Sequence, residues 1–211
     1  MADTHAEMTT AASWSGGVAP YAVNSKKLGM WLFIISDALT FSALLVAYSY
    51  VRMANKSWPT PFEMWPAIGG ATIMTFCLLT SSVTMVMAVS AAHRGLRSLA
   101  AKWLLATMGG GLAFVVLHAR EWLHLIGEGV RPFQNPWGSP LFGATFFTLT
   151  GLHMTHVICG VIYLGVIATG FGVRGKFESI DVEVSGLYWH FVDLVWMFIF
   201  PLVYLMSNKM P

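Results

Sequence analysis

Acidic and imidazole side chains stand inside otherwise apolar runs of this chain, where they could exchange protons or bind a metal. The last run reads Tyr188-Trp-His-Phe-Val-Asp-Leu-Val-Trp196, and its His190 and Asp193 share a helix face through i, i+3 spacing. Asp37 stands in the first run. A charged side chain at the bilayer centre costs about 2.5 kcal/mol or more. Such groups therefore persist where a partner, a lipid headgroup or a proton route compensates them.

The two carboxylates are predicted to lie at one depth in the membrane. Asp37 follows Leu28 by nine residues, and Asp193 follows Val184 by nine residues. At about 1.5 Å per helical residue, both lie roughly 14 Å from the same membrane face. His190 is one turn shallower, so two acids and one imidazole can sit at one level. The order of the helices decides whether they touch.

A second pair of imidazoles lies in the sequence Gly-Leu-His-Met-Thr-His-Val-Ile-Cys-Gly, residues 151–160. We expect His153 and His156 to line one helix face near mid-membrane. Imidazole is a common metal ligand, and His118 stands at a similar depth, so a bis-histidine haem is one interpretation. Hydrogen bonding across helices is the other, and we favour it because two histidines alone are a weak zinc pattern.

Glu121 stands near the end of the third run, about 27 Å from Trp103, and shares a helix face with His124. A glutamate is too short to reach water easily from within lipid, so we expect it to hold a neighbouring helix or a lipid headgroup. Cys77 and Cys159 stand alone in separate apolar runs and are expected to be buried thiols. The sequence predicts no catalytic residue and no metal ligand set.

Five long apolar segments must position these side chains. Of the 211 residues 56% are hydrophobic and only 10% are charged, against about 25% charged in soluble domains. Each segment exceeds the roughly 20 residues that cross the bilayer core as a helix, and none alternates as a barrel strand does. The prediction is an all-α integral membrane protein with segments at about 28–51, 67–92, 103–126, 139–170 and 184–206, a polar tail at 1–27 and a short tail at 207–211.

Five crossings place the two termini on opposite faces of the membrane. One face carries seven basic residues: Lys26, Lys27, Arg94, Arg97, Lys102, Arg174 and Lys176. The other carries four: Arg52, Lys56, Arg131 and Lys209. The positive-inside rule then predicts a cytoplasmic N-terminus and a periplasmic C-terminus. The N-terminal tail lacks the pattern of a cleaved signal peptide, and the net charge of +2 gives no reason to expect nucleic acid as a partner.

Four motifs, in order on four helices, resemble subunit III of the haem–copper oxidases in its five-helix bacterial form. They are Ile35-Ser-Asp-Ala-Leu-Thr-Phe41, Glu121-Trp122, Phe146-Phe-Thr-Leu-Thr-Gly-Leu-His-Met-Thr-His-Val157 and the Tyr188–Trp196 motif. The resemblance covers nearly the whole chain from Leu28 to Met206. Many members have Glu where this chain has Asp37. Asp at this position is similar to the ubiquinol oxidase branch, which does not decide between quinol and cytochrome c as the electron donor.

The resemblance implies a non-catalytic subunit of a proton-pumping terminal oxidase, which reduces oxygen to water in the bacterial inner membrane. The haems and copper are expected in subunits I and II, with none bound by this chain. The chain is expected to contact subunit I directly, to bind structural phospholipid, and to support proton uptake and durability during turnover. Asp37 would be the family's reactive intramembrane carboxylate. The helix-linking or lipid-contacting positions would be Glu121, His153, His156, His190 and Asp193.

Two alternative functions remain open at the level of the sequence. One is the related accessory subunit of a nitric oxide reductase, which the identity of its neighbouring subunits would reveal. The other is a free-standing haem b electron carrier that uses His118 with His153 or His156. A Soret band in the spectrum of the isolated chain would identify that carrier.

Overall fold

The computed structural model describes residues 24–173 and 175–208, and the main elements of these ranges are helical. Five helices are long and apolar enough to cross a membrane, and they include α2 (Ser25–Ala54), α3 (Gly69–His93), α4 (Arg97–Gly127), α5 (Leu141–Ile167) and α6 (Ser179–Ile199). The described residues form no strand beyond isolated bridges. The predicted all-α, five-helix fold is therefore confirmed.

Short turns of other helix types extend these helices. The π-helical turns are η1 (Met64–Ile68), η2 (Ala168–Val173) and η3 (Phe200–Tyr204), and the 3-10 turn η4 (Leu205–Ser207) ends the described chain. With these turns the fourth and fifth spans run to Gly172 and Ser207. Pro201 lies in η3, where its missing N–H group removes one rung of the regular helix ladder.

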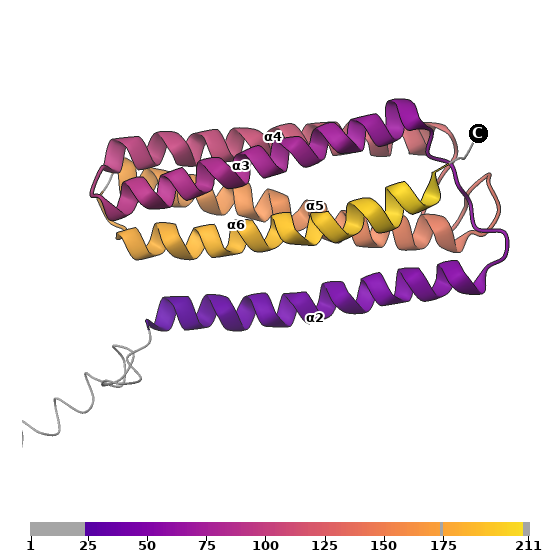
Figure 1. Ribbon diagram of the computed structural model, residues 1–211, viewed down its shortest axis with the longest axis horizontal. Helices are drawn as coiled ribbons and strands as arrows, with labels where there is room; N and C mark the ends of the chain where they lie inside the picture. Colours follow the sequence, from indigo (N-terminus) through magenta and orange to yellow (C-terminus); the bar gives the residue numbers. More distant parts are fainter. Residues whose placement is uncertain (1–23, 174, 209–211) are drawn as a thin grey trace, which may run out of the picture.

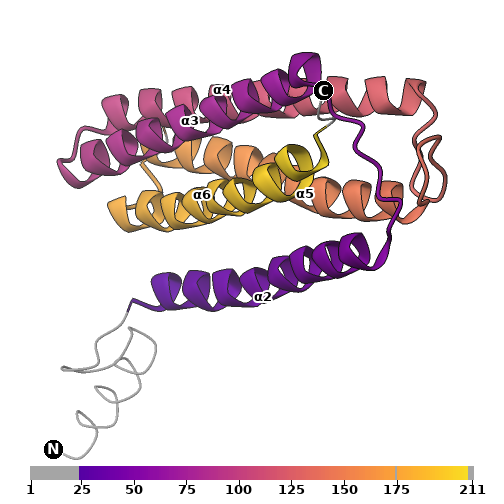
Figure 2. The ribbon, with the colours of Figure 1, turned by 45° about the vertical axis from the view of Figure 1, so that its right-hand side comes forward.

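Helices α3, α4, α5 and α6 form one group, and α2 lies along its side (Figures 1 and 2). The main helix contacts of α2 are with α5 and α6. Only Ile34, Phe41 and Tyr48 of α2 are buried, at intervals of seven residues. That spacing makes one narrow stripe toward the bundle and leaves the other faces of α2 uncovered.

Helix α6 packs against α2, α3 and α5. Two fully buried tryptophans hold it to α3: Trp189 Nε1 donates to Ser81 Oγ at 3.0 Å, and Trp196 Nε1 donates to Thr75 Oγ1 at 2.9 Å. These bonds satisfy indole N–H groups that cannot reach water inside the bundle. They also fix the rotation of α6, which carries His190 and Asp193.

Polar contacts fasten α2 at both of its ends. At the end of the bundle that contains Asn24, called the Asn24 end below, Lys26 Nζ lies 2.6 Å from Asp181 Oδ1. At the opposite end, which contains Asn208 and is called the Asn208 end, Tyr48 Oη and Ser207 Oγ are 3.2 Å apart. Arg52 also donates to the carbonyl oxygens of Leu202 and Met206. Both ends of this lightly packed helix are therefore tied to α6 and its extension.

The helices reach beyond several of the predicted segments. Helix α4 begins at Arg97 where the segment was predicted from 103, and α6 begins at Ser179 where it was predicted from 184. Cys77 is half-buried and Cys159 is exposed, so the expectation of two buried thiols was wrong. Residues 1–23 of the tail predicted at 1–27, residues 209–211 of the tail predicted at 207–211, and Arg174 lie outside the described residues. The membrane orientation stays a prediction.

Candidate functional site

The closest contact between an acid and an imidazole inside the membrane span joins α2 to α5. Oδ2 of Asp37 lies 2.8 Å from Nε2 of His156, although it is not aligned as a conventional hydrogen bond. On its other side, Nδ1 of His156 lies 2.8 Å from the carbonyl oxygen of Leu152, one turn earlier on α5. A carbonyl only accepts, so Nδ1 carries a hydrogen. With a hydrogen on Nδ1, the other ring nitrogen, Nε2, faces the Asp37 carboxyl group, and one further proton can sit on either of these two groups.

A single proton between the two groups has two possible positions. The proton sits on the Asp37 carboxyl group beside a neutral imidazole, or on Nε2 of His156 beside a carboxylate. The pair has no net charge in either arrangement, which limits the cost of keeping it in lipid. Without that proton, a carboxylate oxygen would face the lone pair of Nε2 at 2.8 Å. The geometry is therefore that of a proton-holding pair.

The surroundings of the pair combine aromatic walls with partial access. Asp37 follows Ser25 by twelve residues, which places it roughly 18 Å along a helix about 45 Å long. The Phe41 ring contacts the His156 ring edge-on at a centroid distance of 5.2 Å, and Tyr188 Oη donates to the His156 carbonyl at 2.9 Å. The side chains of His156 and Asp37 remain 16% and 19% exposed. The pair is thus held in place at the partly exposed contact between α2 and α5, called the seam below.

His153 and His156 point to different neighbours, although three residues separate them on α5. His153 is fully buried, and its Nε2 lies 3.1 Å from the carbonyl oxygen of Val192 on α6. His156 meets Asp37 on α2 instead. Helix α5 lies between these two neighbours, so a modest angular difference sends one ring inward and the other to the seam. The two histidines therefore contact different neighbouring helices.

His118 and His153 share the same two aromatic neighbours. The centroid of the Phe114 ring lies 5.4 Å from His118 and 5.5 Å from His153, and that of the Trp196 ring lies 5.6 and 5.2 Å from them. This arrangement is the packing of a filled core. In residues 24–173 and 175–208 no group of three or more His, Cys, Asp and Glu side chains is placed to hold a metal ion. That the chain binds no haem or metal stays a prediction.

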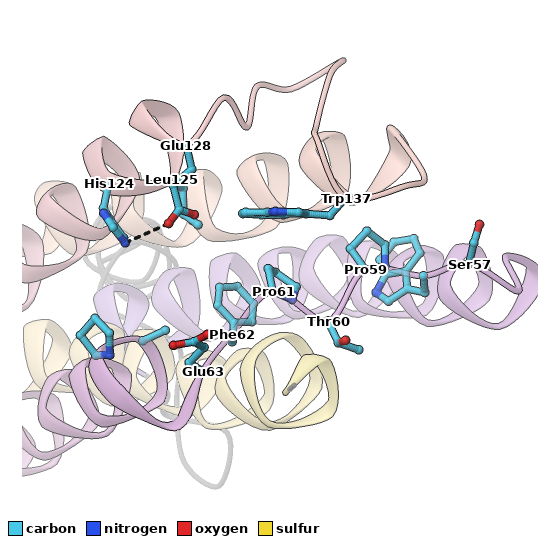
Figure 3. A pocket seen from close by; sticks show the side chains of 13 residues that line it. Ser57, Pro59, Thr60, Pro61, Phe62, Glu63, His124, Leu125, Glu128 and Trp137 are labelled. Carbon is cyan, nitrogen blue, oxygen red and sulfur yellow. Dashed lines mark ion pairs between the residues drawn. The ribbon is translucent and has the colours of Figure 1, made fainter. Parts of the chain in front are cut away.

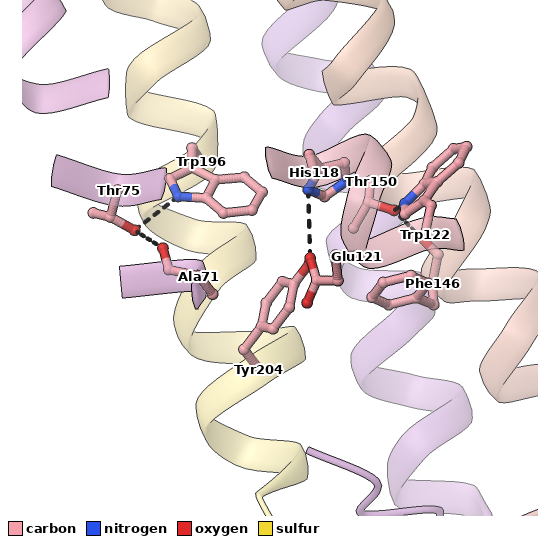
Figure 4. A network of polar contacts seen from close by, with 9 residues as sticks. All are labelled: Ala71, Thr75, His118, Glu121, Trp122, Phe146, Thr150, Trp196 and Tyr204. Carbon is pink, nitrogen blue, oxygen red and sulfur yellow. Dashed lines mark hydrogen bonds and ion pairs between the residues drawn. The ribbon is translucent and has the colours of Figure 1, made fainter. Parts of the chain in front are cut away.

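Glu121 contacts α6's extension rather than His124. Tyr204 Oη donates to Glu121 Oε2 at 2.8 Å, and His118 Nδ1 lies 3.7 Å from the same oxygen (Figure 4). His124 instead pairs with Glu128, with Nε2 and Oε1 3.3 Å apart. Tyr204 is the partner that sequence analysis missed. Its position, three residues after Pro201, gave no sign that the turn there faces α4.

His190 and Asp193 lie where α6 meets α3. Nδ1 of His190 lies 2.6 Å from Oγ of Ser82, a hydroxyl on α3 that the sequence did not single out. Asp193 is buried, and neither of its carboxyl oxygens has a hydrogen-bond partner within the described part of the chain. Asp37 contacts His156 on α5, and the prediction that it shares a level with His190 and Asp193 stays a prediction. The roles of all six predicted side chains stay predictions.

Comparison with known proteins agrees with the resemblance in the motifs. The family model described as "Cytochrome c oxidase subunit III" matches residues 1–208. The chain is 31% identical to the cytochrome bo(3) ubiquinol oxidase subunit 3 of Pseudomonas aeruginosa over 85% of this chain and 84% of that protein. It is 34% identical to the quinol oxidase subunit 3 of Bacillus spizizenii over 85% and 86% of the two chains. It is 32% identical to the cytochrome c oxidase subunit 3 of Alkalihalophilus pseudofirmus over 87% of each.

Proposed function

Because the chain belongs to the subunit III family of the haem–copper oxidases, we propose that it serves its terminal oxidase without a redox centre of its own. In this proposal it packs directly on subunit I, which with subunit II holds the haems and copper. It retains phospholipid and supports proton uptake and durability during turnover in the bacterial inner membrane. The relatives named above are oxidase subunits, which favours this function over a nitric oxide reductase subunit and over a free-standing haem b carrier.

The contact between Asp37 and His156 is the observation that supports a role in proton uptake. A proton that arrives at the carboxyl group can move to Nε2 over 2.8 Å without leaving a net charge in the lipid. The partial exposure of both side chains lets a neighbouring group reach them at the seam between α2 and α5. In the proposal this neighbouring group belongs to subunit I, and the pair buffers protons for it.

Similarity to relatives favours neither electron donor. The three relatives named above are subunits of a ubiquinol, a quinol and a cytochrome c oxidase, and they are between 31% and 34% identical to this chain. The donor docks on other subunits in our proposal, so this chain carries no contact that would select it. Purification of the complex and identification of its subunits would name the donor.

The first experiment deletes this chain from the purified oxidase. We expect the haem spectra to remain while activity is lost faster during turnover, because the haems and copper belong to subunits I and II. Loss of a haem signal on deletion would contradict the proposal. The measurement is an optical spectrum together with the number of turnovers completed before inactivation.

The second experiment addresses the proton-holding pair. Asp37→Asn should leave assembly intact and slow proton uptake modestly, because the amide cannot pass a proton to Nε2 of His156. His156→Gln should have a similar effect, and the double variant should be no slower than either single one, since paired groups act as a unit. Asp193→Asn is the matched control, a buried Asp outside the pair. Additive slowing in the double variant would show that the two groups act separately.

A further inference from the structure

A pocket opens at the Asn208 end, between the segment that joins α2 to α3 and the end of α4 (Figure 3). Its volume is about 590 Å³, and Trp137, Glu63 and Glu128 are among the residues that line it. The two carboxylate side chains are exposed, as is His124, which pairs with Glu128. The pocket is therefore open to the aqueous boundary of the membrane.

A second cavity of about 450 Å³ continues the first along α4. The two cavities share several lining residues: Phe62, Pro66, Ala67, His124 and Leu125. The inner cavity reaches Glu121, which precedes Glu128 by seven residues, or about 10 Å along the helix. The side chain of Glu121 keeps 12% of its surface exposed. A carboxyl group within the membrane span thus has a route to the aqueous boundary.

Glu121 also holds the extension of α6 in place. Tyr204 donates to its carboxyl group, and the buried Tyr204 ring stacks on Phe62 at a centroid distance of 4.9 Å (Figure 4). Phe62 forms part of the wall of both cavities, and its backbone N–H donates to the carbonyl oxygen of Ser207. Ser207 in turn contacts Tyr48 of α2. Glu121, Tyr204, Phe62 and Ser207 are called the Tyr204 clamp below.

The strength of this clamp depends on the charge of Glu121. A carboxylate only accepts hydrogen bonds, and a bond to an ionised acceptor is roughly twice as strong as a bond between neutral groups. When the carboxyl group takes up a proton, the bond from Tyr204 loses this contribution of charge. The clamp is therefore tight around a carboxylate and looser around a carboxylic acid.

We propose that Glu121 is a proton-binding site that exchanges with the aqueous phase at the Asn208 end and sets the tightness of the Tyr204 clamp. This site goes beyond the proposed function, in which Asp37 and His156 hold a proton at the seam. With the predicted orientation, the Asn208 end faces the periplasm. Acidity on that side then loosens the clamp, and with it the end of α2 that Tyr48 joins to Ser207.

Other charged and titratable groups surround Glu121, and they differ in how they respond to pH. Arg120 stays charged throughout, and the side chains of η1 and α3 that line the inner cavity are uncharged. His124 is exposed, so its titration is the alternative source of a pH dependence at this end. The groups to be considered are His118, Arg120, His124 and Glu128 of α4, Tyr204 of η3, His153 of α5, and Glu63 of the segment before η1.

The test measures hydrogen–deuterium exchange of residues 200–208 in the intact complex in nanodiscs, from about pH 5 to about pH 9. Each variant is compared with the wild type at the same pH, which removes the intrinsic pH dependence of exchange. Glu121→Gln keeps an acceptor for Tyr204 but stays neutral. Its exchange should be about fivefold faster than that of the wild type at alkaline pH and equal to it at acidic pH. His124→Gln is the control and should follow the wild type throughout.

A ratio between Glu121→Gln and the wild type that does not change with pH would overturn the proposal. So would loss of the pH dependence in His124→Gln, because His124 would then be the group that titrates. Tyr204→Phe keeps Glu121 but removes the bond, so it should abolish the pH dependence of exchange. This second variant decides the question even if Glu121→Gln fails to assemble, and a pH dependence that survives in it would contradict the clamp.

The route to the carboxyl group has its own test. The infrared band of the Glu121 carboxyl group, assigned by its loss in Glu121→Gln, is followed after a rapid change of pH. Ala67→Phe fills the place where the two cavities meet and should slow the response of this band, whereas Ala106→Phe, at a residue that lines neither cavity, should not. An unchanged response in Ala67→Phe would overturn the route. None of these outcomes depends on which subunits bind the haems, so they are separate from the deletion experiment.

Discussion

Trp189 fills a slot whose walls contain two glycines, and this slot provides a sharp test of how the bundle is packed. A Cβ atom on Gly111 of α4 would lie 2.5 Å from Cη2 of Trp189 and 2.9 Å from Cγ2 of Val161. A Cβ atom on Gly160 of α5 would lie 2.9 Å from Cζ3 of the same indole. Trp189 is fully buried and bonded to Ser81, so its ring has little freedom to move aside.

Gly111→Ala should therefore destabilise the bundle by about 1–3 kcal/mol through overpacking. Ordinary carbon contacts begin near 3.4 Å, so relief of the 2.5 Å contact needs a shift of about 0.9 Å. Such a shift breaks the fit of the ring against Gly160 or lengthens its bond to Ser81. Because Trp189 contacts three other helices, the strain spreads through the bundle.

Gly109→Ala, two residues away on the same helix, is the matched control. Nothing lies within 4 Å of a Cβ atom there. Both variants gain the same helix propensity, up to about 1 kcal/mol, so the difference in their free energies of unfolding isolates the steric effect. The measurement is equilibrium unfolding of the full chain in mixed micelles by titration with sodium dodecyl sulfate. Equal stability of the two variants would refute the assignment of Trp189 to this slot.

Two further predictions concern polar contacts that fasten the helices. Tyr204→Phe removes the donor to Glu121 Oε2 and should cost about 1–3 kcal/mol in the same titration, whereas Tyr50→Phe, on a side chain that is 69% exposed, should cost nothing measurable. Replacing both Lys26 and Lys27 by Gln should speed amide exchange at the start of α2 at low ionic strength, and salt should remove the difference because these cations are 56% and 38% exposed. Lys102→Gln serves as the control for the second prediction. Slower amide exchange in the variant that lacks Lys26 and Lys27 would contradict it.

The number and kind of the membrane helices could be predicted because each apolar run, when coiled as a helix, is long enough to cross the bilayer core. Their ends were harder, since Arg97 and Asp181 look like loop residues in the sequence although both are helical. A helix that projects beyond lipid meets water or headgroups, where charged side chains carry little penalty. A prediction from hydrophobicity alone therefore makes α4 and α6 too short.

The partners of the polar side chains could not be predicted because they depend on the order and rotation of the helices. Equal depth left open whether Asp37 meets His190 and Asp193, and in the structure Asp37 contacts His156 on α5 instead. The contact between Tyr204 and Glu121 depends on the π-helical turn at Pro201. Spacing along one helix gives no information about such turns or about the neighbour that a face meets.

The difference in burial between the histidines separates structural from functional candidates. His118 and His153 are fully buried, with 0% accessible surface, and both pack against Phe114 and Trp196. A proton reaches such rings only if the core opens. His156 keeps 16% of its side-chain surface and contacts an acid on the least packed helix. His190 is also partly exposed, but its partner is the Ser82 hydroxyl, so within the described membrane span His156 is distinguished from His190 by a carboxyl partner with which it can exchange a proton.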